Sequence, residues 1–256
     1  MKQPVVIIGV GEMGGVFARG FLRLGHPVYP VSRQMDMEQE AKNIPDPIMV
    51  LVAVAENDLQ PVLEKIPQQW RNRLTLLQNE LLPRDWQKHG LDNPTVISVW
   101  FEKKKGQDAK VIIPSPVYGP HARLIADALA SIDIPTNILP DAAKLEFELV
   151  LKNVYILTSN ISGLVTGGTV AELWQSHEAL ARKVAGDVME LQEWLTGNKY
   201  DRETLIQGML HAFNGDPDHM CMGRSAPARL ERALKLADTA GLGVEKLKEI
   251  KSGGRK

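Results

Sequence analysis

The sequence has little of what typically stabilises secreted proteins or anchors membrane proteins. Among its 256 residues Cys221 is the only cysteine, so no disulfide can form within the chain. No apolar run approaches the roughly 18 residues of a membrane-spanning helix. The formal net charge of −1 gives no overall field that would attract nucleic acid or an anionic membrane. We therefore expect a cytoplasmic protein without nucleic-acid or membrane partners.

The clearest motif lies near the beginning of the chain. Four apolar residues, Val5 to Ile8, run into a G-x-G-x-x-G turn, and a helical pattern follows it. A dinucleotide-binding turn requires this context of strand and helix. Gly9 permits the tight turn, Gly11 lets the backbone approach a pyrophosphate, and Gly14 lets the helix pack on the strand. The residues predicted to bind a dinucleotide are Gly9, Val10, Gly11, Glu12, Met13 and Gly14. Since the strand begins so close to Met1, we expect no signal peptide.

The end of the second predicted strand, Val28 to Val31, carries the signal for the choice of cofactor. In a dinucleotide-binding fold an acidic residue at this place binds the ribose 2′-hydroxyl of NAD. Here Ser32 and Arg33 follow the strand instead, and the acidic residues come later. A guanidinium and a hydroxyl suit a 2′-phosphate. The sequence therefore favours NADP (NADPH) over NAD, with Ser32 and Arg33 as its ligands.

Two halves of different character divide the chain near residue 140. In the first half, apolar runs alternate with helical patterns, which is typical of parallel β-α-β units. Further strands are predicted at 48–54, 74–77, 95–100 and 110–113, and helices at 56–66, 85–89 and 121–131. The segment 135–140, with a proline at each end, is the last of this half. The second half shows helical patterns alone, at 142–165, 176–195 and 201–213. A capping box at Thr169 predicts a short helix, and a last helix begins after Ser225 as its cap and ends at Gly241. We predict an α/β dinucleotide-binding domain at 1–140 and an all-helical substrate and dimerisation domain at 141–256.

The first helix of the second half carries a candidate catalytic group. Helical spacing places Lys152, Ile156 and Asn160 on one face. A lysine can protonate the oxygen of a carbonyl that accepts hydride, and an amide can hold the carbonyl or a substrate hydroxyl. The alternative is a surface ion pair, because Glu148 precedes Lys152 by four residues. Residue chemistry alone leaves both interpretations open.

Over most of its length the chain resembles the ketopantoate reductases (2-dehydropantoate 2-reductases). The matching segments are Gly9 to Gly14, Gly25-His26-Pro27-Val28, Ser32-Arg33, Leu77-Gln78-Asn79, Lys152 and Asn160. The resemblance implies an N-terminal Rossmann-type doubly wound sheet followed by an all-helical C-terminal domain. It also implies Lys152 as the catalytic lysine, Asn79 as a ligand of nicotinamide and substrate, and Asn160 as a substrate ligand.

The same resemblance shows where this chain departs from the family pattern. Ile156 stands where the family has a second asparagine. Ser225 matches a substrate-binding serine, but Ala226 to Arg229 stand where an acidic residue would follow. Arg224 offers a cation for a substrate carboxylate. A site that lacks hydrogen-bonding partners discriminates poorly between polar substrates, so pantoate formation is one candidate among several.

We therefore expect an NADP(H)-dependent reductase of a small 2-keto acid or related carbonyl compound, acting as a homodimer. The six histidines show no metal-ligand spacing, and we expect no metal site. Two alternatives remain. The chain could be an NADP(H)-binding sensor without efficient catalysis, which the departures at Ile156 and Ala226–Arg229 would suit. It could also be a 3-hydroxy-acid dehydrogenase of the wider group.

Overall fold

The computed structural model describes residues 2–253, and the chain divides into two compact units, Met1–Leu149 and Val150–Lys256. The long helix α6 (Ala142–Thr166) begins in the first unit and ends in the second. The functional division predicted at residue 140 stays a prediction. Within residues 2–253, no helix combines the length and the apolar character that crossing a membrane requires.

The first unit is built on a seven-stranded sheet with the order β2-β1-β3-β4-β5-β8-β9. Strands β1 to β5 are parallel to one another, and β8 runs antiparallel to β5. The strands are β1 (Val5–Ile8), β2 (Val28–Val31), β3 (Met49–Val52), β4 (Leu74–Leu76), β5 (Thr95–Ile97), β8 (Ser115–Tyr118) and β9 (Thr136–Ile138). This mostly parallel sheet confirms the predicted α/β class.

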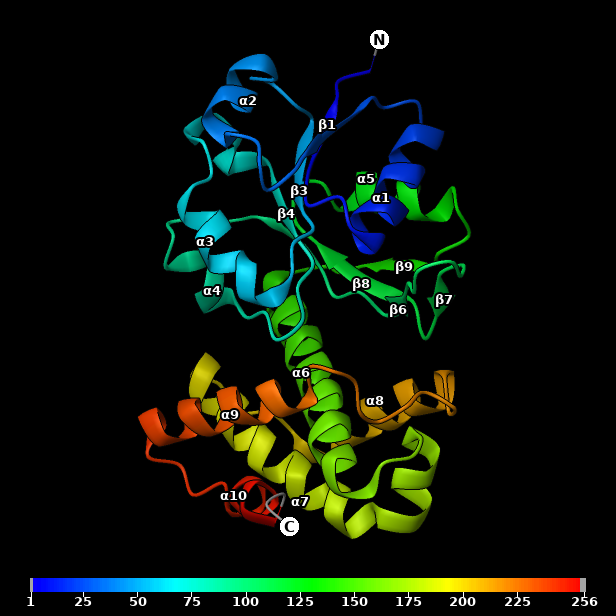
Figure 1. Ribbon diagram of the computed structural model, residues 1–256, viewed down its shortest axis with the longest axis vertical. Helices are drawn as coiled ribbons and strands as arrows, with labels where there is room; N and C mark the ends of the chain where they lie inside the picture. The colour runs from blue at the N-terminus through cyan, green and yellow to red at the C-terminus, as the bar shows by residue number, and fades with distance from the viewer. Residues whose placement is uncertain (1, 254–256) are drawn as a thin grey trace. The chain divides into compact units, whose positions relative to one another are not determined.

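Helices cover both faces of this sheet, which explains why its central strands are apolar throughout. Every residue of β1 and β3 is buried, as expected of parallel strands covered on both sides. In Figure 1, α1 and α5 lie on one side of the strands, and α2, α3 and α4 lie on the other. The helices are α1 (Glu12–Arg23), α2 (Met37–Asn43), α3 (Leu59–Glu64), α4 (Pro83–Gln87) and α5 (Ala122–Ala130), with 3₁₀ turns at Glu56–Asp58 and Gln68–Arg73.

The structure corrects several predicted elements of the first unit. The strand predicted at 95–100 ends at Ile97, and the strand predicted at 110–113 is limited to β7 (Lys110–Val111). Strand β7 pairs with β6 (Phe101–Glu102), which was not predicted, in a separate hairpin. Strands β8 and β9 were not predicted. Pro116 interrupts the usual strand composition of β8, and β9 is an exposed edge strand in a segment flanked by prolines. Helix α2 was also missed, because Ala41 is its only buried residue and leaves no apolar period.

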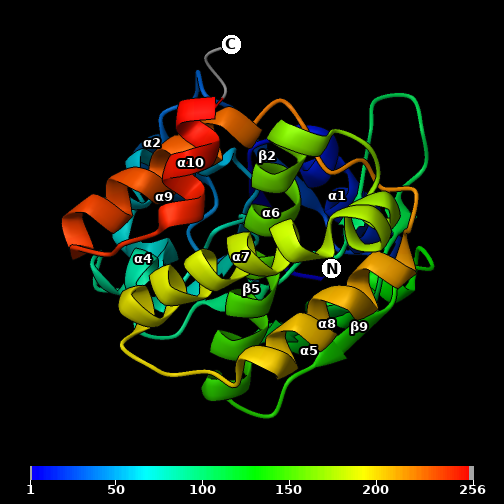
Figure 2. The ribbon, with the colours of Figure 1, turned by 90° about the horizontal axis from the view of Figure 1, so that it is seen from below.

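The second unit is helical, as predicted. Besides α6 it contains α7 (Val170–Thr196), α8 (Arg202–Gly215), α9 (Ala226–Ala240) and α10 (Glu245–Gly253). Helices α9 and α10 pack on α7 and on each other, and Figure 2 shows them at the same end of this unit. The predicted capping box is present, since Thr169 Oγ1 accepts from the Glu172 N–H at 3.2 Å. The two helices predicted after it form one helix with a kink at His177.

Candidate functional site

The glycine-rich turn between β1 and α1 has the geometry that its sequence predicts. Gly9 has a φ of 95°, and a Cβ there would lie 2.6 Å from the Ala53 carbonyl oxygen, so only glycine fits. A Cβ on Gly14 would collide with the Gly9 carbonyl oxygen. At Gly11, by contrast, a Cβ would meet no atom within 4 Å. The turn is therefore closely packed on the protein side and open above Gly11, where a phosphate would approach.

A large cavity of about 980 Å³ opens beside this turn. It extends over the carboxyl ends of β1, β2 and β3, where α/β folds bind nucleotides. Its lining residues include Gly9, Val10 and Gly11 from the turn, Ser32, Arg33, Asp36 and Glu38 after β2, and Ala53, Asp58 and Lys65 from the segment after β3. The structure thus brings the predicted glycines together with Ser32 and Arg33 in one cavity.

Three charged side chains of this cavity, those of Arg33, Asp36 and Asp58, have partners within the protein. Arg33 Nη2 lies 2.5 Å from Oδ2 of Asp58, although 84% of the Arg33 side chain is exposed. The carboxylate of Asp36 accepts a hydrogen bond from the Glu38 N–H at 3.0 Å and so caps α2. The acidic group closest in sequence to the end of β2 is therefore engaged at a helix terminus.

A second, smaller cavity also borders the turn. Its volume is about 270 Å³, and Val10, Gly11, Glu12, Gly15, Val16, Arg19 and Lys103 line it. Lys103 Nζ lies 3.1 Å from Oε2 of Glu12. Lys103 is not among the predicted site residues, since it lies in a charged run that indicates only a solvated turn. Asp58 is not among them either, since it lies within the helix predicted at 56–66 and matches no motif.

Asn79 lies just beyond β4 and is half-buried, but it does not line either of these cavities. Its neighbour Gln78 is buried and donates from Nε2 to the carbonyl oxygens of Val52, at 2.7 Å, and Val54, at 3.3 Å. Gln78 therefore ties the end of β4 to the end of β3. The role of Asn79 toward nicotinamide and substrate stays a prediction.

Lys152 lies on α6 with only 9% of its surface exposed. Glu148, the proposed surface partner, is itself within 3.3 Å of Lys144 one turn earlier. A buried ammonium is costly unless its surroundings compensate for lost water, so buried lysines are often functional. The burial argues against a solvated surface ion pair as the role of Lys152.

Asn160, two turns after Lys152, is buried and has partners at both ends of its amide. Its Oδ1 accepts a hydrogen bond from Arg229 Nη1 at 2.7 Å, and its Nδ2 donates to the Cys221 carbonyl at 2.9 Å. The chain passes close to α6 here because Gly163 has no side chain. A Cβ on Gly163 would lie 2.8 Å from the Cβ of Cys221. Burial, and secondarily the Glu172 carboxylate, raises the pKa of the Cys221 thiol to about 11, which makes it a poor nucleophile.

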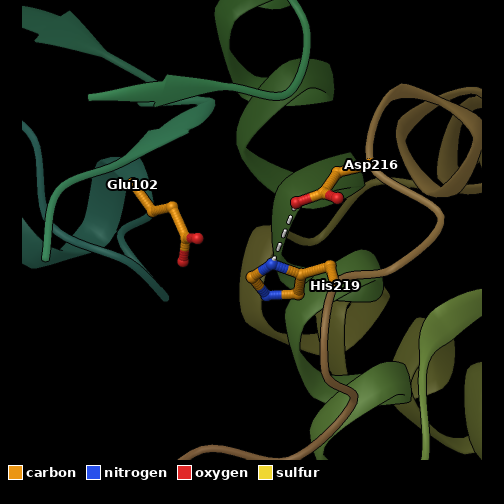
Figure 3. A group of neighbouring side chains, drawn as sticks. All are labelled: Glu102, Asp216 and His219. Atoms are coloured by element: carbon orange, nitrogen blue, oxygen red, sulfur yellow. Dashed lines mark ion pairs between the residues drawn. The ribbon is translucent and has the colours of Figure 1, made fainter. Parts of the chain in front are cut away.

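The segment before Cys221 holds a carboxylate–imidazole pair (Figure 3). Asp216 is buried, and its Oδ2 lies 3.5 Å from Nδ1 of His219. The His219 carbonyl accepts from the Val170 N–H at 2.9 Å, which fixes this segment to the beginning of α7. Glu102, also drawn in Figure 3, belongs to the first unit, where its carboxylate lies 3.0 Å from Lys104 Nζ.

The two remaining predicted site residues, Arg224 and Ser225, are both exposed. Ser225 is the N-cap residue of α9, as expected, but it has helical backbone angles and its side chain makes no capping hydrogen bond. The predicted capping role of its hydroxyl is therefore wrong. The substrate-binding roles of both residues stay predictions.

Comparison with known proteins shows a likeness in structure that is barely visible in sequence. No protein-family model matches the chain, and no curated protein matches it. The 2-dehydropantoate 2-reductase from Methylococcus capsulatus is 12% identical, with a TM-score of 0.70 over 99% of this chain and 98% of that one. A dimeric ketopantoate reductase from Staphylococcus aureus is 18% identical, with a TM-score of 0.67 over 98% and 97%. D-mandelate dehydrogenase in complex with NADH is 12% identical, with a TM-score of 0.66 over 97% and 96%. The chain therefore has the fold of the ketopantoate reductases.

Proposed function

We propose that the chain is a divergent relative of the ketopantoate reductases and reduces a small 2-keto acid with NADPH. The observation that carries this proposal is the turn at Gly9 to Gly14, which is open above Gly11 and borders a cavity of about 980 Å³. The similar structures support it, since they are named as reductases of ketopantoate and as a dehydrogenase of D-mandelate bound to NADH. These names describe a 2-keto acid and a 2-hydroxy acid.

The cavity residues support NADPH rather than NADH. The exposed guanidinium of Arg33 and the hydroxyl of Ser32 lie after β2, where a 2′-phosphate would be bound. Asp36 caps α2 and is therefore engaged away from the role of a ribose-binding carboxylate. Arg33 would exchange Asp58 for the phosphate.

The second unit supplies the proposed proton donor. A bound nicotinamide supplies hydride to a carbonyl carbon. Lys152, nearly buried on α6, would donate a proton to the carbonyl oxygen. Asn79 and Asn160 are proposed to orient the substrate, with Arg224 or Ser225 at its carboxylate. Asn160 would do so through Arg229, because both ends of its amide are already engaged.

The test is NADPH oxidation by the purified protein across a panel of 2-keto acids, with 3-keto acids as the comparison set. The proposal predicts turnover with at least one branched or aryl 2-keto acid. Turnover of the 3-keto acids alone would support a 3-hydroxy-acid dehydrogenase. Tight NADPH binding without turnover of either set would support an NADP(H) sensor, which the departures at Ile156 and Ala226–Arg229 favour.

We further propose that the protein is a homodimer. The similar reductase from Staphylococcus aureus is described as dimeric, and this chain covers 97% of it. The molar mass in solution, measured by light scattering, tests this directly against the 28.4 kDa of one chain.

A further inference from the structure

Lys103 lies beside the glycine-rich turn because the β6–β7 hairpin is fixed to the core of the first unit. Phe101, two residues earlier, is buried, and its ring lies 6.1 Å from the ring of Phe17 on α1. Phe101 pairs with Val111 across the hairpin. Lys103 Nζ also donates to the Lys104 carbonyl at 2.9 Å, and only 20% of the side chain is exposed. The ammonium is therefore held in place rather than extended into solvent.

The carboxylate that pairs with Lys103 belongs to Glu12, the first residue of α1. A carboxylate at a helix N-terminus is stabilised by the free N–H groups and the positive end of the helix dipole. In a dinucleotide-binding turn, however, the pyrophosphate uses the same N–H groups. The Glu12 carboxylate would repel that anion unless a cation offsets it. Lys103, at 3.1 Å, supplies the offsetting charge.

The smaller cavity offers room for an anion at this position. It measures about 270 Å³, and it shares Val10 and Gly11 with the larger cavity. Arg19 adds a second cation to its lining, and Gly15 leaves its wall open, since a Cβ there would meet no atom within 4 Å. Two cations and one carboxylate thus face a space that begins at the glycine turn.

We propose that Lys103 is a ligand of the cofactor pyrophosphate. When the dinucleotide binds, the pyrophosphate replaces Glu12 as the partner of Lys103. This inference rests on the proposed function, since it assumes that a dinucleotide binds at the turn. Without cofactor the Glu12 carboxylate offsets the charge of Lys103, and breaking this pair makes the ammonium available to the phosphate. Because NADH and NADPH share the pyrophosphate, Lys103 contributes to the binding of both.

The experiment compares dissociation constants for NADPH and NADH, by titration calorimetry, in the unmodified protein and five variants. Lys103→Met should weaken both cofactors by about tenfold, as expected for a lost charge-assisted hydrogen bond. Lys103→Arg, which keeps the charge, should stay within about threefold of the wild type, because a bidentate cation also binds phosphate. Lys105→Met, on the exposed part of the same hairpin, should change neither constant. Glu12→Gln should tighten both, because it removes the competing carboxylate.

Arg33→Met makes the outcomes distinguishable, since it should weaken NADPH alone. If Arg33→Met weakens NADPH while Lys103→Met changes neither cofactor, the inference about Lys103 is wrong and the cofactor proposal stands. A higher KM for the keto acid in Lys103→Met, with unchanged cofactor constants, would also overturn it. If the wild type binds neither nucleotide, both proposals fail together.

Discussion

Arg229 donates a 2.7 Å hydrogen bond to Oδ1 of Asn160, so the amide oxygen predicted to bind the substrate already accepts a hydrogen bond from an arginine. The other end of the Asn160 amide donates to the Cys221 carbonyl. Asn160 thus joins α6 to the segment before α9 and to α9 itself. A residue placed in this way contributes to stability as well as to any role in binding.

We expect Asn160→Ala to lower the free energy of unfolding by about 2 kcal/mol or more. The substitution leaves the buried Cys221 carbonyl without this donor and removes one acceptor from Arg229, and each such loss costs about 1–3 kcal/mol. Calorimetric or urea unfolding measures the change, with Gln175→Ala on the exposed surface of α7 as the control. An unfolding midpoint equal to that of the control would contradict the structural role.

Lys152→Met should abolish turnover and leave NADPH binding nearly intact. Loss of a positioned general acid typically lowers kcat by about 10²- to 10⁴-fold, whereas the cofactor cavity lies in the first unit and does not include Lys152. Steady-state kinetics and an NADPH titration give the two values. Lys144→Met, two turns earlier on the same helix and paired with Glu148, is the matched control and should retain activity. Undiminished turnover in Lys152→Met would remove it from the mechanism.

Substitutions of the two members of the Arg33–Asp58 ion pair should have opposite effects on the affinity for NADPH. Arg33→Met should weaken NADPH by about tenfold or more with little effect on NADH, since only NADPH carries the 2′-phosphate. Asp58→Asn should strengthen NADPH, because it frees the guanidinium and removes a repelling charge. Competition titrations with both cofactors measure these changes. Equal effects of Arg33→Met on NADH and NADPH would contradict recognition of the 2′-phosphate.

His121, at the beginning of α5, should make the free energy of unfolding depend on pH. Burial, and secondarily the nearby Arg73 charge, lowers the pKa of His121 below its ordinary value of 6.5. The unfolded chain therefore takes up this proton at a higher pH than the folded chain. The stabilising contribution of neutral His121 is complete above pH 6.5 and is lost as the pH falls through the lower pKa of the folded state.

Urea unfolding above and below pH 6.5 tests this dependence. The wild type should lose stability on acidification more steeply than His121→Gln, whose side chain does not titrate. Other groups titrate equally in both proteins, so the difference between the two slopes isolates His121. Parallel slopes would show that His121 is not responsible.

Local pattern was enough to predict the glycine-rich turn, the helical second half and the proximity of Ser32 and Arg33 to the turn. The strand β1 is buried on both faces, and the glycines at 9 and 14 are required by close contacts, so sequence and structure agree there. The caps at Thr169 and Gly241 were also predictable, because each is fixed by neighbours in the chain.

Contacts between distant segments were not predictable in the same way. Strand β9 is paired along one edge only and has little buried apolar surface. Lys103 reaches Glu12 because Phe101 packs on Phe17, and a single sequence gives no sign of this. The partners of Asn160 likewise come from segments far along the chain. The structure therefore adds to the sequence those parts of the candidate site in which long-range packing positions charged and polar groups.

Transfer of deuterium from NADPH labelled at C4 of the nicotinamide would show directly whether this protein reduces a 2-keto acid. The protein is incubated with labelled NADPH and the 2-keto acid that supports the fastest turnover, and the product is examined by mass spectrometry and NMR. We expect one deuterium at C2 of a 2-hydroxy acid, from one face of the nicotinamide only, with no transfer in Lys152→Met. Saturable NADPH binding with no label in any product across the panel would contradict it.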